Sequence, residues 1–185
     1  MPSSQRRVQI FLDLSNMYHG LKAQFPWGGG KYDVEKLGRQ VTGPRNLIGL
    51  SIYDALKDPK MEPKGARLQQ RFHLTIQRLS CPSFPIVLIT RPLAYTRFFP
   101  EVPPVEKGID ARIVQDMIVG AFDSCYDVGV LLSGDRDFED VVRFLSSGRF
   151  SIDLETYYPM SRRHLAELTK SCFSKAIVID KRFYQ

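Results

Sequence analysis

Four aspartates in three separated segments are the residues of this chain whose type and spacing could do chemistry. Asp13 ends the apolar run RVQIFLD, Asp110 lies in EKGIDARIVQD, and Asp135 and Asp137 follow the apolar run VGVLLSG. A buried strand that stops at a carboxylate delivers a negative charge to its carboxyl tip, and several such charges tolerate one another only around a cation. The pattern therefore predicts a site for a divalent ion, Mg²⁺ or Mn²⁺, at the ends of strands.

The elements that must position these acids alternate along the chain between strands and helices. Apolar runs rich in β-branched residues predict strands, and these span residues 7–13, 46–55, 84–92, 127–134, 149–157 and 175–180. Helical spacing of apolar residues predicts helices, and these span residues 17–25, 33–41, 66–79, 109–122, 135–145 and 161–170. This alternation predicts an α/β fold with three layers, in which a doubly wound, mainly parallel sheet is covered on both faces. We expect one domain over residues 1–185, with its core at about 7–180.

The four aspartates should converge if this sheet forms. Ligands of a parallel sheet bind outside the carboxyl ends of its strands, at the point where the strand order switches. Asp13 follows the first strand, Asp135 and Asp137 follow the fourth, and Asp110 opens the helix between the third and fourth strands, which begins at the same edge. Taken singly, each acid has another explanation, as a helix cap, a first-turn acid or a turn residue.

Further polar residues accompany the acids. Asn16 adds an oxygen or an amide donor just beyond Asp13, Ser15 and Ser133 could bind a water or a phosphate, and Lys107 could neutralise a phosphate. A further aspartate, Asp116, lies six residues after Asp110. That separation is about 600° of helix, so the two point to different faces. We expect Asp116 either to support the site indirectly or to be solvated.

The composition indicates a basic, globular protein without a membrane segment. The chain has 26 basic and 20 acidic residues and a formal net charge of +6, which favours polyanionic partners such as nucleic acid. We expect no secretory signal, and the sequence contains no run of roughly 20 apolar residues. Its three cysteines, Cys81, Cys125 and Cys172, are widely spaced and predict reduced thiols. We expect a cytoplasmic protein.

A long segment after the third strand, residues 94–108, contains three prolines and three aromatics and predicts a loop of unusual length. Arg91, Arg97 and Tyr95, with two neighbouring phenylalanines, could hold the phosphates and stack the bases of a single strand, and Lys107 extends this surface. The alternative is that the phenylalanines are buried and the arginines are solvated.

Two other aspartate-based sites are excluded by the residues that follow Asp13. A haloacid-dehalogenase-type phosphatase needs a second aspartate two positions later, where Ser15 stands. An integrin-type site needs DxSxS, but Met17 occupies the last position. A P-loop or a GxGxxG nucleotide site is also unsupported, because no glycine-rich turn follows a strand.

Three motifs together resemble the NYN domain family, the PIN-like nucleases related to the LabA group. FLDLSN resembles the opening FIDxxN motif of that family, VEKGIDARIVQDM resembles its KGxD…D helix, and LLSGDRDF resembles its SGDxDF element. The motifs stand in the family's order and the resemblance spans about residues 7–180. Leu14 and Ser15 stand where a glycine is common in the family, which leaves Asp13 and Asn16 in place.

The resemblance implies a PIN-like sheet with strand order 3-2-1-4-5 and metal-dependent cleavage of RNA. The family's metal-binding acids correspond to Asp13, Asp110, Asp135 and Asp137, with Asn16 beside them, and its helix aspartate corresponds to Asp116.

Our leading hypothesis is a metal-dependent endoribonuclease that acts on single-stranded RNA. A second hypothesis is a catalytically weak or inactive PIN-like module that binds RNA or acts as a scaffold. A third is a phosphatase or nucleotidase for small phosphate esters. Homo-oligomer formation is left open by the sequence.

Overall fold

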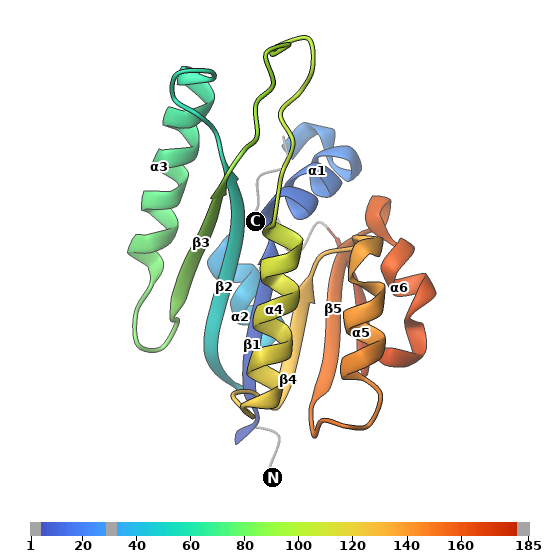
Figure 1. Cartoon of the computed structure of the whole chain (residues 1–185). Helices are drawn as coiled ribbons and strands as arrows, with labels where there is room; N and C mark the ends of the chain where they lie inside the picture. The colour runs from blue at the N-terminus through green and yellow to red at the C-terminus, as the bar shows by residue number, and fades with distance from the viewer. Residues whose placement is uncertain (1–4, 29–32, 181–185) are drawn as a thin grey trace.

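A six-stranded parallel sheet forms the centre of the protein (Figure 1). The structure is a computed structural model, and it describes residues 5–28 and 33–180. The strands are β1 (Arg7–Asp13), β2 (Asn46–Leu56), β3 (Ile86–Pro92), β4 (Val128–Leu132), β5 (Asp153–Pro159) and β6 (Lys175–Ile179). Their order is β3-β2-β1-β4-β5-β6. This confirms the PIN-like order predicted for the first five strands, and β6 extends the sheet beside β5.

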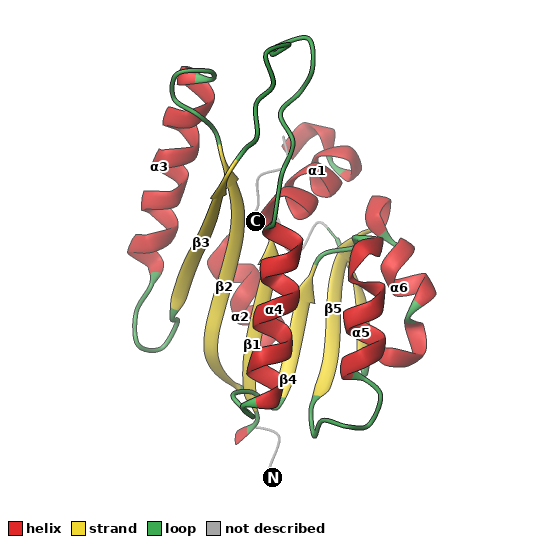
Figure 2. Ribbon diagram, in the orientation of Figure 1, coloured by secondary structure: helices red, strands yellow, loops and turns green. Residues whose placement is uncertain are grey.

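Helices cover both faces of the sheet (Figure 2). The α-helices are α1 (Leu14–Gln24), α2 (Val34–Thr42), α3 (Pro63–Leu79), α4 (Ile109–Phe122), α5 (Glu139–Leu145) and α6 (His164–Leu168). Short 3₁₀ turns complete the described part, namely η2 (Pro26–Gly28), η3 (Arg136–Phe138), η4 (Met160–Arg162) and η5 (Lys170–Cys172). None of the described helices is both long and apolar enough to cross a membrane.

Two apolar clusters lie on opposite faces of the sheet because successive side chains of a strand point to opposite sides. In β1, Ile10 and Leu12 pack with buried residues of α1, α2 and α3, whereas Phe11 packs with those of α4, α5 and α6. All five residues of β4 are buried. The expected three-layer α/β architecture is therefore confirmed, and its central strands are covered on both faces.

The strand order switches between β1 and β4, which are parallel neighbours. The chain leaves β1 for β2 on one side, whereas β4 begins the other half of the sheet. Leu12 pairs with Leu132, so the two strands end at the same level. This register brings the segment after Asp13 beside the segment after β4, at the edge where ligands of such sheets bind.

Some boundaries differ from those predicted. α1 begins at Leu14 rather than at residue 17, because the Asp13 side chain caps it directly at the end of β1. α3 begins at Pro63 because proline fits the first helical turn, where its missing N–H has no partner to lose. The helix predicted over residues 161–170 is divided into η4, α6 and η5.

The long loop between β3 and α4 rises beyond the carboxyl ends of the strands (Figure 1). An isolated antiparallel bridge closes its base, with N···O distances of 2.9 Å from Ala94 to Val105 and 3.0 Å in the reverse direction. The loop is thus pinched at its base and leads directly into α4 and Asp110. It has more internal order than its proline content predicted.

Candidate metal centre

Asp13 is a buried carboxylate held from two directions. The residue is 4% exposed. Oδ1 accepts a hydrogen bond from the backbone N–H of Asn16 at 3.0 Å, and Oδ2 accepts one from the hydroxyl of Ser133 at 2.9 Å. Burial raises the pKa of Asp13 to about 7, the two hydrogen bonds oppose this rise, and the charges of Asp110 and Glu106 add to it. A nearby cation would favour the charged form.

Asn16 joins Asp13 to the segment after β4. Its carbonyl oxygen accepts from the backbone N–H of Gly134 at 3.1 Å, and its amide donates to Oδ2 of Asp135 at 3.2 Å. The hydroxyl of Ser133 accepts from the backbone N–H of Asp135 at 3.1 Å while it donates to Asp13. Both side chains therefore orient carboxylates, and Ser133, which is fully buried, is not open to a ligand.

Asp110 approaches the same edge from the first turn of α4. Partial burial of its carboxylate raises its pKa although the residue as a whole is exposed, and the charges of Asp135, Glu106 and Asp137 raise it further. These charges act on Asp110 because the loop end and the two strand ends lie within electrostatic range of one another. We call Asp13, Asp110, Asp135 and Asp137 the aspartate cluster. None of its members forms a salt bridge within the described part of the chain.

A small cavity of about 140 Å³ lies between these segments. It is lined by Asp13, Ser15, Asn16, His19, Glu106, Asp110, Asp135 and Arg162. We call it the acidic cavity. Three members of the aspartate cluster line it, whereas Asp137 lies just outside and its backbone N–H caps Oδ1 of Asp135 at 3.2 Å.

Glu106 is a site residue that the sequence prediction missed. It lines the acidic cavity, and its charge raises the pKa of both Asp13 and Asp110. Its only signal in the sequence is its position in EKGID, at the end of the long loop, four residues before Asp110. Only the path of the loop brings Glu106 back to the edge of the sheet.

The oxygen atoms at this edge are of the chemical type that binds a hard divalent ion. Carboxylates and an amide oxygen are the ligands that Mg²⁺ prefers, and Mg²⁺ retains several waters, so it needs only a few of them. In residues 5–28 and 33–180, no group of three or more Asp, Glu, His or Cys side chains is arranged to hold a metal ion. The aspartate cluster is thus an open arrangement rather than a closed protein cage.

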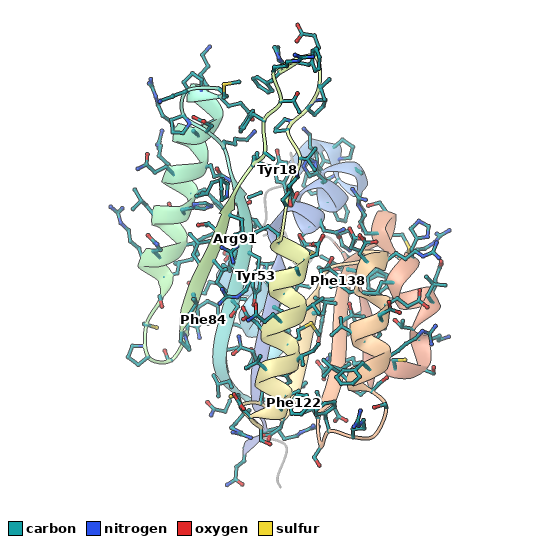
Figure 3. All side chains as sticks on the ribbon, viewed as in Figure 1. Tyr18, Tyr53, Phe84, Arg91, Phe122 and Phe138 are labelled. Carbon is teal, nitrogen blue, oxygen red and sulfur yellow. The ribbon has the colours of Figure 1, made fainter. Side chains whose placement is uncertain are left out.

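Asp116 does not belong to the cluster. It accepts hydrogen bonds from the Tyr53 hydroxyl and from the Arg112 guanidinium, each at 2.9 Å. Tyr53 reaches α4 from β2 across the face of the sheet (Figure 3), and its burial raises its own pKa. Asp116 therefore ties α4 to the sheet, a role different from both the indirect support and the solvation that were expected.

The residues predicted to bind RNA lie around the long loop. Arg91 is exposed near the end of β3, and Arg97 is exposed and lies over the ring of Phe98, 4.7 Å from its centroid. Phe98 is 54% exposed, so it is not buried as the alternative supposed. Lys107 is exposed just before α4.

Tyr95 has a structural role within the same loop. Its hydroxyl donates to Glu62 at 2.8 Å and accepts from the backbone N–H of Asp58 at 3.2 Å. Its ring also packs edge-on against Phe99. These contacts fasten the loop to the start of α3, so any stacking on RNA would use the remaining ring surface.

Comparison with known proteins adds a family and a fold. The model of the NYN domain family matches residues 7–174. No curated protein matches the chain significantly. Among solved structures, a protein of unknown function from Vibrio parahaemolyticus is similar, with a TM-score of 0.70 and 20% sequence identity over 100% of this chain and 99% of that chain. At that identity the likeness supports the fold alone.

Proposed function

The chain belongs to the NYN domain family of nuclease-like domains, and from that premise we propose that it is a metal-dependent ribonuclease hydrolysing the phosphodiester bonds of single-stranded RNA. The single domain at about residues 7–180 would carry the activity. The three cysteines are free thiols, which supports a reducing compartment, and we place the protein in the cytoplasm.

The aspartate cluster would hold one or two ions of Mg²⁺ or Mn²⁺. Bound there, a divalent ion would lower the pKa of a water and stabilise the departing oxygen of a phosphodiester. Asp13 would supply a carboxylate whose direction is fixed by Asn16 and Ser133. Asn16 would also orient Asp135 through its amide. Ser15 and Glu106, which line the acidic cavity, stand next to this donor set.

The substrate would follow the basic surface around the long loop. Arg91, Arg97 and Lys107 are exposed there and would contact RNA phosphates, and the ring of Tyr95 would contact a base. Lys107 lies three residues before Asp110, so an RNA strand bound by Lys107 would pass the acidic cavity. The loop would thus direct the strand toward the carboxylates.

One observation carries the proposal, namely that acids from three separated segments gather at one edge, where none of them forms a salt bridge within the described residues, although Arg162 lines the same cavity. Burial and mutual repulsion raise the pKa of both Asp13 and Asp110. Perturbed carboxylates beside a cavity are characteristic of functional sites, because a fold gains no stability from such repulsion. A cluster neutralised by arginines would instead be a structural feature.

The test is cleavage of a labelled single-stranded RNA in Mn²⁺ by the native protein and by Asp135→Asn. We expect products from the native protein only. The matched control is Asp140→Asn, which removes an exposed acid from the next helical turn without touching the acidic cavity and should cleave normally. Equal cleavage by native protein and Asp135→Asn would contradict the proposed site.

The open arrangement of the cluster favours a second candidate, an RNA-binding or scaffold module without useful turnover. Such a module would bind RNA with an affinity that falls with salt and would release no product in Mn²⁺. A phosphatase would instead hydrolyse mononucleotides, so including uridine 3′-monophosphate in the assay separates all three functions.

A further inference from the structure

A second and larger cavity adjoins the acidic cavity. Its volume is about 460 Å³, within the usual range for small-ligand sites. Its lining residues are Asn16, Gly134, Asp135, Arg136, Arg162, His164, Glu167 and Leu168. Asn16, Asp135 and Arg162 line both cavities, so the two are neighbours across a shared wall.

The second cavity adds basic groups to the acids it contains, Asp135 on the shared wall and Glu167. It presents Arg136, Arg162 and the imidazole of His164, so we call it the basic cavity. Within the described part of the chain, neither arginine forms a salt bridge. The carboxylate of Glu167 is instead held by Arg163, at 2.8 Å. Two arginine side chains beside a cavity are thus available to an anion.

Arg162 is fixed on the shared wall by close backbone contacts. A Cβ on Gly134 would lie 1.6 Å from the carbonyl oxygen of Arg162, so only glycine allows the segment after β4 to approach it. On the other side, a Cβ on Gly20 would lie 2.8 Å from Cγ of Arg162. The hydroxyl of Ser161 donates to the carbonyl of Gly20 at 2.8 Å. Arg162 is therefore held against both α1 and the segment carrying Asp135.

We propose that the basic cavity binds the nucleotide next to the scissile linkage. The phosphate of that nucleotide lies between Arg136 and Arg162, and its sugar or base rests on Leu168, which is 42% exposed. This inference rests on the proposed function, since it assigns the scissile phosphate to the acidic cavity. A strand crossing the shared wall then places one phosphate with the carboxylates and the next with the arginines.

The proposal defines a substrate class. A chain with a further phosphate beyond the cleaved bond fills both cavities, whereas a mononucleotide fills only one. Because arginine contacts to phosphate are charge-assisted and bidentate, the second contact adds affinity and fixes the register of the strand. Oligonucleotides with a phosphate beyond the cleaved bond are therefore the substrates, and small phosphate esters are poor ones.

The test compares two adjacent arginines. Arg162 lines both cavities, whereas Arg163 lines neither and pairs with Glu167 at the surface, where such a pair contributes little. Binding of a short fluorescein-labelled oligouridylate is measured by anisotropy in EDTA over a range of salt. We expect Arg162→Gln to weaken binding about tenfold. It should also reduce the slope of the logarithm of the binding constant against the logarithm of the salt concentration by about 0.7, which is the contribution of one phosphate contact on a single strand. Arg163→Gln leaves the carboxylate of Glu167 without its partner beside the basic cavity, so it should weaken binding slightly, by clearly less than Arg162→Gln.

Glutamine retains the Cγ that packs on Gly20, so Arg162→Gln should preserve the fold, and thermal melting of each variant checks this. If Arg162→Gln unfolds, Arg136→Gln, which removes the other arginine of the basic cavity, is compared with Arg163→Gln in its place. The double variant Arg136→Gln/Arg162→Gln should lose less than the sum of the single losses, because both arginines share one phosphate. Full additivity, or equal binding by Arg162→Gln and Arg163→Gln, would overturn the proposed pocket.

The use of EDTA separates this inference from the proposed function. If binding depends on Arg162 but no RNA is cleaved in Mn²⁺, the proposed role of the basic cavity stands and the proposed ribonuclease activity is refuted. If RNA is cleaved and Arg162→Gln does not affect the cleavage, the ribonuclease activity stands and the proposed role of the basic cavity is refuted.

Discussion

The two edges of the sheet use aspartate and glutamate in opposite ways. At the amino edge, acids are paired with arginines, in Arg6–Asp153 at 2.6 Å, Arg7–Asp127 at 2.8 Å and Arg45–Glu155 at 2.6 Å. At the carboxyl edge, the aspartate cluster has no such partner within the described residues, and its members repel one another. The comparison separates acids that are paired and stabilise the fold from a cluster that is unpaired within the described residues, as the proposed metal site requires.

The pKa directions follow the same division. Hydrogen bonds from Arg7 hold the pKa of Asp127 below its ordinary value, so this acid stays charged and contributes to folding. Burial raises the pKa of Asp13, so its charged form is disfavoured until a cation is present. Four changes test whether this division is real.

The largest expected effect is on cleavage. Asp110→Asn removes a member of the aspartate cluster and should lower the rate roughly a thousandfold, because charge stabilisation by a bound ion is worth several kcal/mol. Asp153→Asn removes an acid from the opposite edge and should leave the rate within about twofold. Single-turnover cleavage of labelled RNA measures both. Equal losses of cleavage rate in Asp110→Asn and Asp153→Asn would show that the two edges do not differ in function.

The next effect is a pH dependence set by Asp13. Because the folded-state pKa is raised from 3.8 to about 7, its contribution to stability is present below pH 4 and is lost as the pH rises through 7. The full loss is roughly 4 kcal/mol in metal-free protein. Denaturant unfolding in EDTA from pH 4 to 8 should therefore show a falling stability that Asp13→Asn flattens. An identical slope in both proteins would refute the assignment.

A stability effect of similar size is expected at the amino edge. The side chains of Arg45 and Glu155 are 12% and 9% exposed, and Glu155→Gln leaves a buried guanidinium without its counter-charge. Breaking such a pair should cost about 3 kcal/mol in the free energy of unfolding at pH 7. Asp110→Asn serves as the comparison and should cost nothing, since it relieves repulsion. A loss caused by Asp110→Asn would mean that the carboxyl edge is also structural.

The smallest effect is stabilisation by metal. Mn²⁺ at a hundred times its dissociation constant should raise the free energy of unfolding of the native protein by about 2.7 kcal/mol. Asp110→Asn should remove most of this gain, whereas Glu155→Gln should retain it despite starting from a lower stability. Thermal melting with and without Mn²⁺ measures the gain independently of RNA cleavage. A gain that persists in Asp110→Asn would place the ion elsewhere.

Local patterns in the sequence are sufficient for the fold, and they single out most of the acids of the candidate site. The alternation of apolar runs and helical spacing predicts each of the six strands that the structure describes, and Asp13 and Asp135 are recognisable as acids that follow buried strands. Their dual role as helix caps is equally local, since each accepts from a backbone N–H two or three residues away. Glu106 escapes such reasoning because no local pattern distinguishes it from a solvated loop acid.

The sequence by itself determines which carboxylates stand at strand ends, because burial and capping act between residues close in the chain. Only the tertiary structure decides which of those carboxylates meet an arginine and which meet one another. Arg7 and Asp127 are separated by 120 positions, as are Asp13 and Ser133, yet the first contact neutralises an acid and the second orients one. Electrostatic pairing depends on distance in space, and for both contacts that distance is set by the strand order, which makes β1 and β4 neighbours.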